Sequence, residues 1–101
     1  MARTPIHPGE ILADELAELG MSAKQLASLI EVPPNRLYQI VAGKRAISAD
    51  TALRLGQYCG MSADFWMDLQ MAYELDLARQ ESGKIIQRLP SRADGQPRPA
   101  A

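Results

Sequence analysis

Several features that define common protein classes are missing from this sequence of 101 residues. A single cysteine, Cys59, excludes an internal disulfide and any metal site built from several thiolates. Cys59 is better explained as a small buried residue near a helix end. No apolar run approaches the ~18 residues that span a bilayer, and residues 1–10 lack the apolar stretch of a signal peptide. We therefore expect a cytoplasmic protein without a membrane partner.

Motifs for catalysis and cofactor binding are missing as well. His7 is the single histidine and is far in sequence from Cys59, and neither HExxH nor a glycine-rich phosphate loop occurs. The sequence therefore predicts no enzyme, no cofactor and no metal. His7 precedes a predicted helix, where its side chain can approach the free N–H groups of the first turn.

The most informative feature that is present lies in residues 22–48, which read as two short helices joined by a tight turn. Ser22 can cap the first helix in a capping box with Gln25. Pro34 fits the first position of the second helix, where its fixed φ is suitable and its missing N–H is not needed. The first helix should end near Ile30, which leaves a gap of about three residues, as expected of a helix-turn-helix corner.

Helical periodicity divides the second of these helices into two faces. With about 100° between residues, the apolar face holds Leu37, Ile40 and Val41, and the opposite face holds Asn35, Tyr38, Gln39 and Ala42. Gly43 can end the helix in a left-handed conformation, and the basic loop that follows suits contact with a DNA backbone or base edges. An ordinary helical hairpin with a solvated polar face is the alternative, and the basic loop favours DNA.

The net charge of −1 hides an uneven distribution of charges along the chain. Residues 21–60 hold five basic side chains against two acidic ones, whereas residues 8–20 and 61–82 are acidic. The basic side chains are Lys24, Arg36, Lys44, Arg45 and Arg54. Because the local field steers a protein onto DNA, this pattern supports a nucleic-acid interface. A solvated surface of mixed charge can give the same distribution of charges along the chain by chance.

The remaining segments complete a single all-α domain of five helices. The first helix should run over residues 8–19, the fourth over 49–59 and the fifth from 63 to about 81, before Gly83. Ser48 and Ser62 are expected to cap the last two. The expected core residues of the first and fourth helices are Ile11, Leu12, Leu16, Leu19, Ala52, Leu53 and Leu55.

The two ends of the chain are expected to differ from this helical domain. Residues 1–7 read as an N-terminal arm, residues 8–90 as the domain with a short C-terminal extension, and residues 91–101 as a disordered tail. The short apolar run at residues 85–89 could pair as an extended piece or cap the bundle.

The fifth helix carries two apolar stripes, where a surface helix of a monomer needs only one. One stripe can close the core and consists of Trp66, Leu69, Tyr73 and Leu77. The other is predicted to be a dimer interface and consists of Met67, Met71, Leu75 and Ala78. Two-fold dimers are the commonest oligomers, although residues 84–90 could fold back over this stripe, and methionine-rich surfaces also suit a different protein.

The core pattern and three further motifs of the sequence resemble a known family. The helix-turn-helix core has the phage-repressor pattern, formed by Leu26, Ala27, Ile30, Val32, Leu37 and Ile40. More narrowly, HPGEIL at residues 7–12, GKRAIS at 43–48 and FWMDLQMAYELDLAR at 65–79 resemble the HigA family of antitoxins, also described as plasmid-maintenance antidote proteins of the VapI type.

This resemblance implies a small dimer that neutralises a HigB-like toxin, an RNA-cleaving protein, and represses the operon that encodes both. By position, the second helix of the motif would read a palindromic operator in the major groove. The implied DNA contacts are Lys24, Asn35, Arg36, Tyr38, Gln39, Lys44 and Arg45. Arg36 could bond guanine, and Gln39 or Asn35 could bond adenine.

The sequence departs from the family pattern in two features, the turn residue and a proline pair, and two other functions stay open. Glu31 replaces the usual turn glycine, and positive φ costs a non-glycine residue about 1 kcal/mol, so another turn shape is expected. The proline pair before Asn35 leaves the second helix of the motif without a side-chain cap and with fewer free N–H groups.

The alternative functions are a phage-type repressor without a toxin partner and a protein-binding inhibitor that no longer reads DNA.

Overall fold

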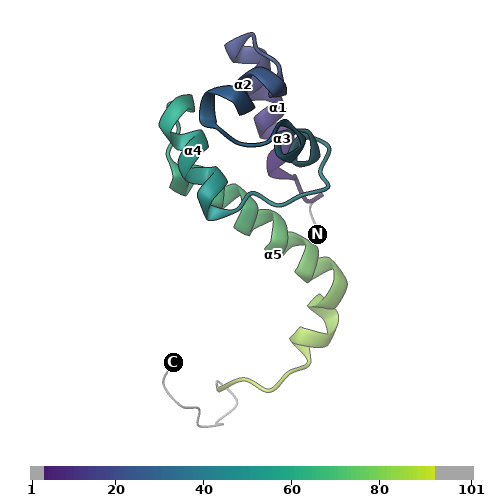
Figure 1. Ribbon diagram of the computed structural model, residues 1–101. Helices are drawn as coiled ribbons and strands as arrows, with labels where there is room; N and C mark the ends of the chain where they lie inside the picture. Colours follow the sequence, from purple (N-terminus) through teal and green to yellow (C-terminus); the bar gives the residue numbers. More distant parts are fainter. Residues whose placement is uncertain (1–3, 93–101) are drawn as a thin grey trace.

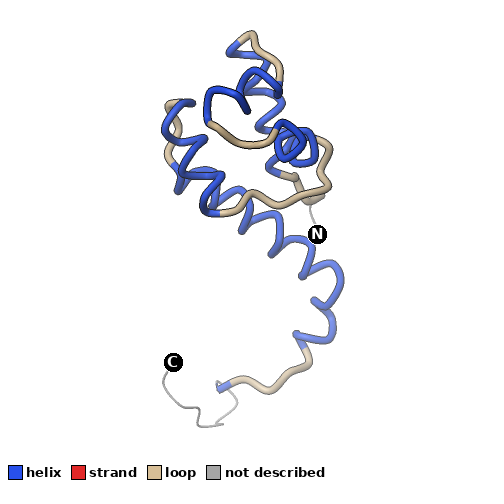
Figure 2. The backbone as a smooth tube through the Cα atoms, viewed as in Figure 1, coloured by secondary structure: helices blue, strands red, loops and turns tan. Residues whose placement is uncertain are grey.

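The computed structural model describes residues 4–92, and within this range the chain forms five α-helices and no strand (Figures 1 and 2). They are α1 (Pro8–Leu19), α2 (Ala23–Ile30), α3 (Pro34–Val41), α4 (Ala49–Cys59) and α5 (Ala63–Gln87). The all-α prediction is confirmed. The predicted tail lies outside the described residues from position 93 onward.

The predicted signals at the helix ends are confirmed by hydrogen bonds and backbone angles. Ser22 forms both halves of the capping box with Gln25. Ser48 and Ser62 each accept the N–H of the residue three positions on. Gly20 and Gly60 end α1 and α4 in the left-handed region that favours glycine. Short-range side-chain chemistry therefore sets most of the helix limits.

The core lies where α1, α2, α3 and α4 meet the first part of α5. α5 packs chiefly on α4 and also contacts α1, and its second part projects away from the other helices (Figure 1). The most deeply buried large side chains include Leu12, Leu26, Leu37, Ile40, Ile47, Leu55 and Trp66. Each of them stabilises the fold by about 1.5–3 kcal/mol through removal of apolar surface from water. No helix within the described range has both the length and the apolar character to cross a bilayer.

Leu53 was expected in the core, and this prediction is wrong. α4 buries Ala52, Leu55 and Cys59, which are three or four residues apart and share one face. Leu53 is displaced by about 100° from Ala52 around the helix, and it is 65% exposed. Cys59 is buried as predicted, and burial together with Glu15 raises the pKa of its thiol to about 11. Its thiol is therefore neutral and unreactive near pH 7.

The predicted end of the fifth helix is also wrong. α5 continues through Gly83 to Gln87, because glycine inside a helix costs only about 1 kcal/mol and Gly83 does not adopt positive φ. Residues 84–87 consequently extend the helix and do not fold back over its second apolar stripe. Ile85 and Ile86 stay more than half exposed.

Candidate nucleic-acid interface

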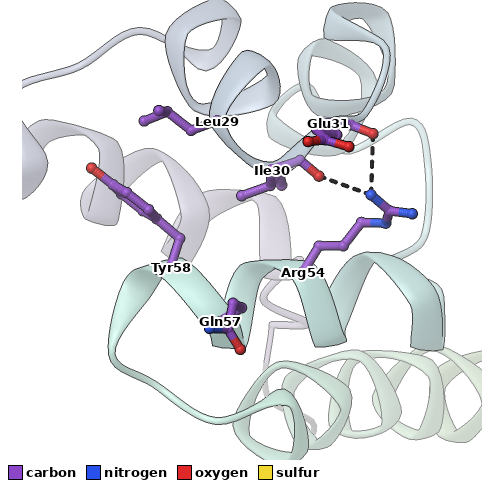
Figure 3. Close-up of a pocket in the computed structure, with 6 residues that line it drawn as sticks. All are labelled: Leu29, Ile30, Glu31, Arg54, Gln57 and Tyr58. Atoms are coloured by element: carbon purple, nitrogen blue, oxygen red, sulfur yellow. Dashed lines mark hydrogen bonds between the residues drawn. The ribbon is translucent and has the colours of Figure 1, made fainter.

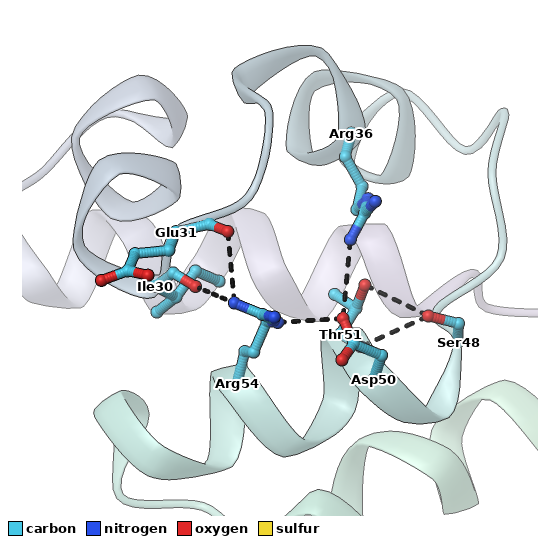
Figure 4. Close-up of polar contacts among 7 residues, drawn as sticks. All are labelled: Ile30, Glu31, Arg36, Ser48, Asp50, Thr51 and Arg54. Atoms are coloured by element: carbon cyan, nitrogen blue, oxygen red, sulfur yellow. Dashed lines mark hydrogen bonds and ion pairs between the residues drawn. The ribbon is translucent and has the colours of Figure 1, made fainter.

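The turn between α2 and α3 keeps the left-handed conformation that was not expected of a glutamate. Glu31 has φ 60° and ψ 50°, and the N–H of Val32 bonds the carbonyl of Ala27 at 3.0 Å. Arg54 of α4 donates Nη1 to the carbonyl oxygens of Ile30 and Glu31, at 2.9 and 3.2 Å (Figure 4). Charge-assisted bonds of this kind are about twice as strong as neutral ones, so they offset the cost of the strained turn.

The outer face of α3 is exposed at Asn35, Tyr38 and Ala42 and partly covered between them. Asn35 and Tyr38 are exposed, with 47% of Tyr38 accessible, while Gln39 is half-buried. Lys44 and Arg45 lie exposed in the loop after α3, and Lys24 is exposed in the first turn of α2. Pro33 provides no side-chain cap for α3, as predicted. The polar face of α3 and the basic loop together form the surface that we call the α3 face.

Arg36 stands apart from the rest of the α3 face. Its guanidinium turns toward α4, where Nη1 lies 3.7 Å from Oδ2 of Asp50, and its side chain is 30% exposed (Figure 4). Asp50 also accepts Nε of Arg54 at 2.9 Å. The carboxylate of Asp50 therefore links Arg36 of α3 to Arg54, the arginine that bonds the turn between α2 and α3. A salt bridge this exposed contributes at most about 1 kcal/mol, so Arg36 can leave Asp50 at little cost.

Gln39 and Arg45 are brought together by the path of the loop. The N–H of Lys44 bonds the carbonyl of Gln39 at 2.8 Å, and Gly43 adopts φ 76°. This closure returns the chain along α3, so that Nε of Arg45 donates to Oε1 of Gln39 at 2.8 Å. The glycine is needed here because other residues rarely adopt this φ. Two predicted DNA contacts thus touch each other directly.

Two hollows flank α4. One, of about 360 Å³, lies beside the first turn of α4 and is lined by Arg36, Arg45, Ala46, Ser48, Asp50 and Thr51. Its two arginines and the N-terminus of α4 favour an anion, whereas the carboxylate of Asp50 in the same lining already pairs with Arg36 and opposes one. The other, also about 360 Å³, lies between α2 and α4, with Leu29 and Tyr58 on one side and Arg54 on the other (Figure 3). It offers less to an anion, because its one arginine, Arg54, already bonds two backbone carbonyls and Asp50.

Gln70 was missed by the sequence interpretation, although it anchors the loop that carries the basic residues. It is 5% exposed, and its Oε1 accepts the N–H of Ile47 at 2.8 Å while Nε2 donates to Glu74 at 2.9 Å. The available signal was a polar residue within an apolar stripe, four positions after Trp66 and three before Tyr73. A buried amide with both ends bonded fixes the loop on α5.

His7 supports the same loop from the other side. Its Nδ1 accepts the N–H of Gly9 at 2.8 Å, which caps α1 as predicted. The ring contacts Tyr73 edge-on at 4.8 Å between centroids, and it donates a hydrogen bond to the backbone of Arg45. Burial lowers the pKa of His7 from its usual 6.5, an effect that Glu10 and the Arg45 backbone partly offset.

We expect the free energy of unfolding to fall as the pH is lowered through about 6.5, because the unfolded chain then binds a proton that folded His7 resists. Protonation also removes the Nδ1 acceptor that caps α1. In His7→Asn, an amide oxygen can replace that acceptor without titrating. Urea unfolding at pH 7.5 and 5.5 should show a smaller pH dependence for His7→Asn. Equal dependence in the two proteins would place the titrating group elsewhere.

Comparisons with known proteins agree with this geometry. The model of the helix-turn-helix family matches residues 12–66. Virulence-associated protein I of Dichelobacter nodosus is 46% identical over 90 residues, which cover 88% of this chain and 83% of that protein. An addiction module antidote protein of a HigA family from Coxiella burnetii superimposes with a TM-score of 0.85 at 49% identity, covering 88% of this chain and 98% of the other.

A third similar protein is seen with DNA. The Pseudomonas aeruginosa antitoxin HigA, solved with the higBA promoter, has a TM-score of 0.82 and 46% identity to this chain, covering 87% of this chain and 97% of the other. Two of these three proteins are thus named as an antidote or an antitoxin of the HigA type, and none of the three is named as an enzyme.

Proposed function

Since the chain belongs to the helix-turn-helix family, and within it to the HigA antitoxins, we propose that it binds operator DNA as a dimer, represses its own operon and neutralises a HigB-like toxin. The observation that carries the DNA part of this proposal is the α3 face. It presents polar side chains from one exposed helix surface and ends in the exposed pair Lys44 and Arg45.

The DNA part is further supported by a similar protein of known structure. The Pseudomonas aeruginosa antitoxin HigA is seen with the higBA promoter. Residues 12–66, which match the helix-turn-helix family, include all of α2, α3 and α4. We assign base contacts to Asn35, Tyr38 and Gln39, and backbone contacts to Lys24, Arg36 and Lys44. Arg45 can contact either a base or the DNA backbone.

The dimer part is supported by the second stripe of α5. Met71 and Leu75 are 58% and 46% exposed, Ala78 is exposed, and Met67 is half-buried against the core. These side chains lie on α5, whose second part projects from the bundle (Figure 1). Ile85, seven residues after Ala78, is 56% exposed and prolongs the stripe by two turns. We propose that the same stripe of a second copy covers it.

The DNA assignment is tested by retardation of the DNA upstream of the gene. Asn35→Ala and Tyr38→Ala should each weaken binding about 10–100-fold, since a base contact is worth about 1–3 kcal/mol. Gln57→Ala, an exposed change on α4 outside the α3 face, serves as the matched control. If the α3 variants bound as tightly as the control, α3 would not be the reading helix.

The toxin assignment is tested by co-expression with the product of the neighbouring gene. We expect the two proteins to co-purify and this chain to relieve growth arrest by its partner. Operator binding without a partner would indicate a phage-type repressor. A bound partner without operator binding would indicate an inhibitor that no longer reads DNA. Either result would contradict one half of the proposal and leave the other standing.

A further inference from the structure

We propose that Gln39 and Arg45 read one base pair as a unit, and that the hydrogen bond between them makes this unit select guanine over adenine. The inference rests on the proposed function, because it takes the α3 face to be the DNA-reading surface. It goes further by assigning a base and by giving Arg45 two roles, to orient the Gln39 amide and to contact the base itself.

The orientation of the Gln39 amide follows from the chemistry of its neighbour. Arginine has N–H donors and no acceptor, and Nε of Arg45 lies 2.8 Å from the end of the Gln39 side chain. The amide must therefore turn its oxygen to Arg45, which directs Nε2 and its two N–H groups away from the guanidinium. An isolated glutamine could present its amide either way round.

The pair is held by its surroundings as well as by this bond. The N–H of Lys44 donates a hydrogen bond to the carbonyl of Gln39, and this bond fixes the start of the loop. The Arg45 backbone accepts a hydrogen bond from the His7 ring, and Gln70 Oε1 accepts the N–H of Ile47 two residues further on. Arg45 therefore starts from an anchored backbone on both sides. Less conformational entropy is lost when such a preorganised pair meets a base.

The pair presents donors to the DNA. Nε2 of Gln39 and the Nη groups of Arg45 all donate hydrogen bonds. Guanine offers two acceptors in the major groove, O6 and N7, whereas adenine offers the acceptor N7 beside the donor N6. A pair of donors can form two hydrogen bonds with guanine, to O6 and to N7. With adenine one of the donors faces the N6 amino group, which is itself a donor, so that bond cannot form. The usual glutamine–adenine contact needs the Gln39 oxygen, and Arg45 already occupies that atom.

The test is a base-substitution profile of the full chain. Affinity is measured by fluorescence anisotropy for the upstream fragment and for fragments that each carry one changed base pair. The proteins are wild type, Gln39→Ala, Arg45→Ala and Lys44→Ala. The last removes the same charge from the neighbouring residue and serves as the matched control.

We expect one position in each half-site where replacing G·C by A·T weakens wild-type binding at least tenfold. Gln39→Ala and Arg45→Ala should both reduce this discrimination to threefold or less and leave other positions unchanged. Lys44→Ala should weaken all fragments alike, because a phosphate contact carries no sequence information. Retention of the full guanine preference in Arg45→Ala, or an A·T pair at the position that Gln39 reads, would overturn the inference. A wild-type chain without any sequence preference would instead remove the proposed function itself.

Discussion

Gly9→Ala is expected to destabilise the fold by roughly 3 kcal/mol, at the upper end of the cost of overpacking. α1 crosses α3 with Gly9 against the backbone of Ile40. A Cβ at Gly9 would collide with the carbonyl oxygen of Ile40 and lie 2.8 Å from its carbonyl carbon. Alanine would otherwise favour the helix by about 1 kcal/mol, so the collision outweighs helix propensity. The total free energy of unfolding of a small domain is about 5–15 kcal/mol, so this loss is a large part of it.

The matched control for this change is Gly83→Ala in α5. A Cβ at Gly83 would meet no atom within 4 Å, and the residue lies inside the helix. The same substitution should therefore stabilise the protein by up to about 1 kcal/mol. Urea unfolding followed by circular dichroism measures both variants. A Gly9→Ala protein as stable as wild type would show that α1 and α3 do not approach so closely, and a destabilised Gly83→Ala would contradict the extended α5.

The double variant Met71→Glu with Leu75→Glu is expected to be monomeric at concentrations where wild type is a dimer. Because both copies of a two-fold dimer carry the two introduced carboxylates, the change replaces apolar contact by four like charges gathered at one interface. Operator affinity should then fall about 100-fold or more, because one monomer loses the gain from binding two half-sites at once. Sedimentation velocity and anisotropy give the two readouts.

Leu53→Glu is the matched control for the dimer. Leu53 is 65% exposed on α4, outside the α5 stripe, so the same change of chemistry there should leave the dimer and its operator affinity intact. A wild-type chain that sediments as a monomer at micromolar concentration would contradict the role of the stripe. The same would follow from a double variant that stays dimeric.

Local signals in the sequence were sufficient for most of the fold. The capping serines, Pro34, Gly20 and Gly60 each act through atoms within a few residues, so they could be recognised without knowing the packing. Gly83 was misleading because glycine ends a helix only where it takes the left-handed conformation. Leu53 was misplaced because its hydrophobicity was counted without regard to its angle around α4.

The contacts that organise the α3 face could not be predicted in the same way. Arg54 holds the turn at Glu31 from 23 residues away in sequence, and no periodicity links the two. Asp50 draws Arg36 toward α4 by a contact between separate helices. Gln39 meets Arg45 only after the loop has turned at Gly43. Residue type and exposure were predictable at these sites, whereas the direction of each side chain depended on tertiary partners.

The most direct measurement for the central claim is a hydroxyl-radical footprint of the wild-type chain on the DNA upstream of its gene. A dimer that inserts two α3 helices into the major groove should protect two patches on one face of the duplex. Their centres should lie about 34 Å, one helical turn, or a multiple of it apart. The footprint should disappear in the monomeric α5 double variant at the same protein concentration. A single protected patch, uniform protection along the fragment, or an unchanged footprint in that variant would contradict the account.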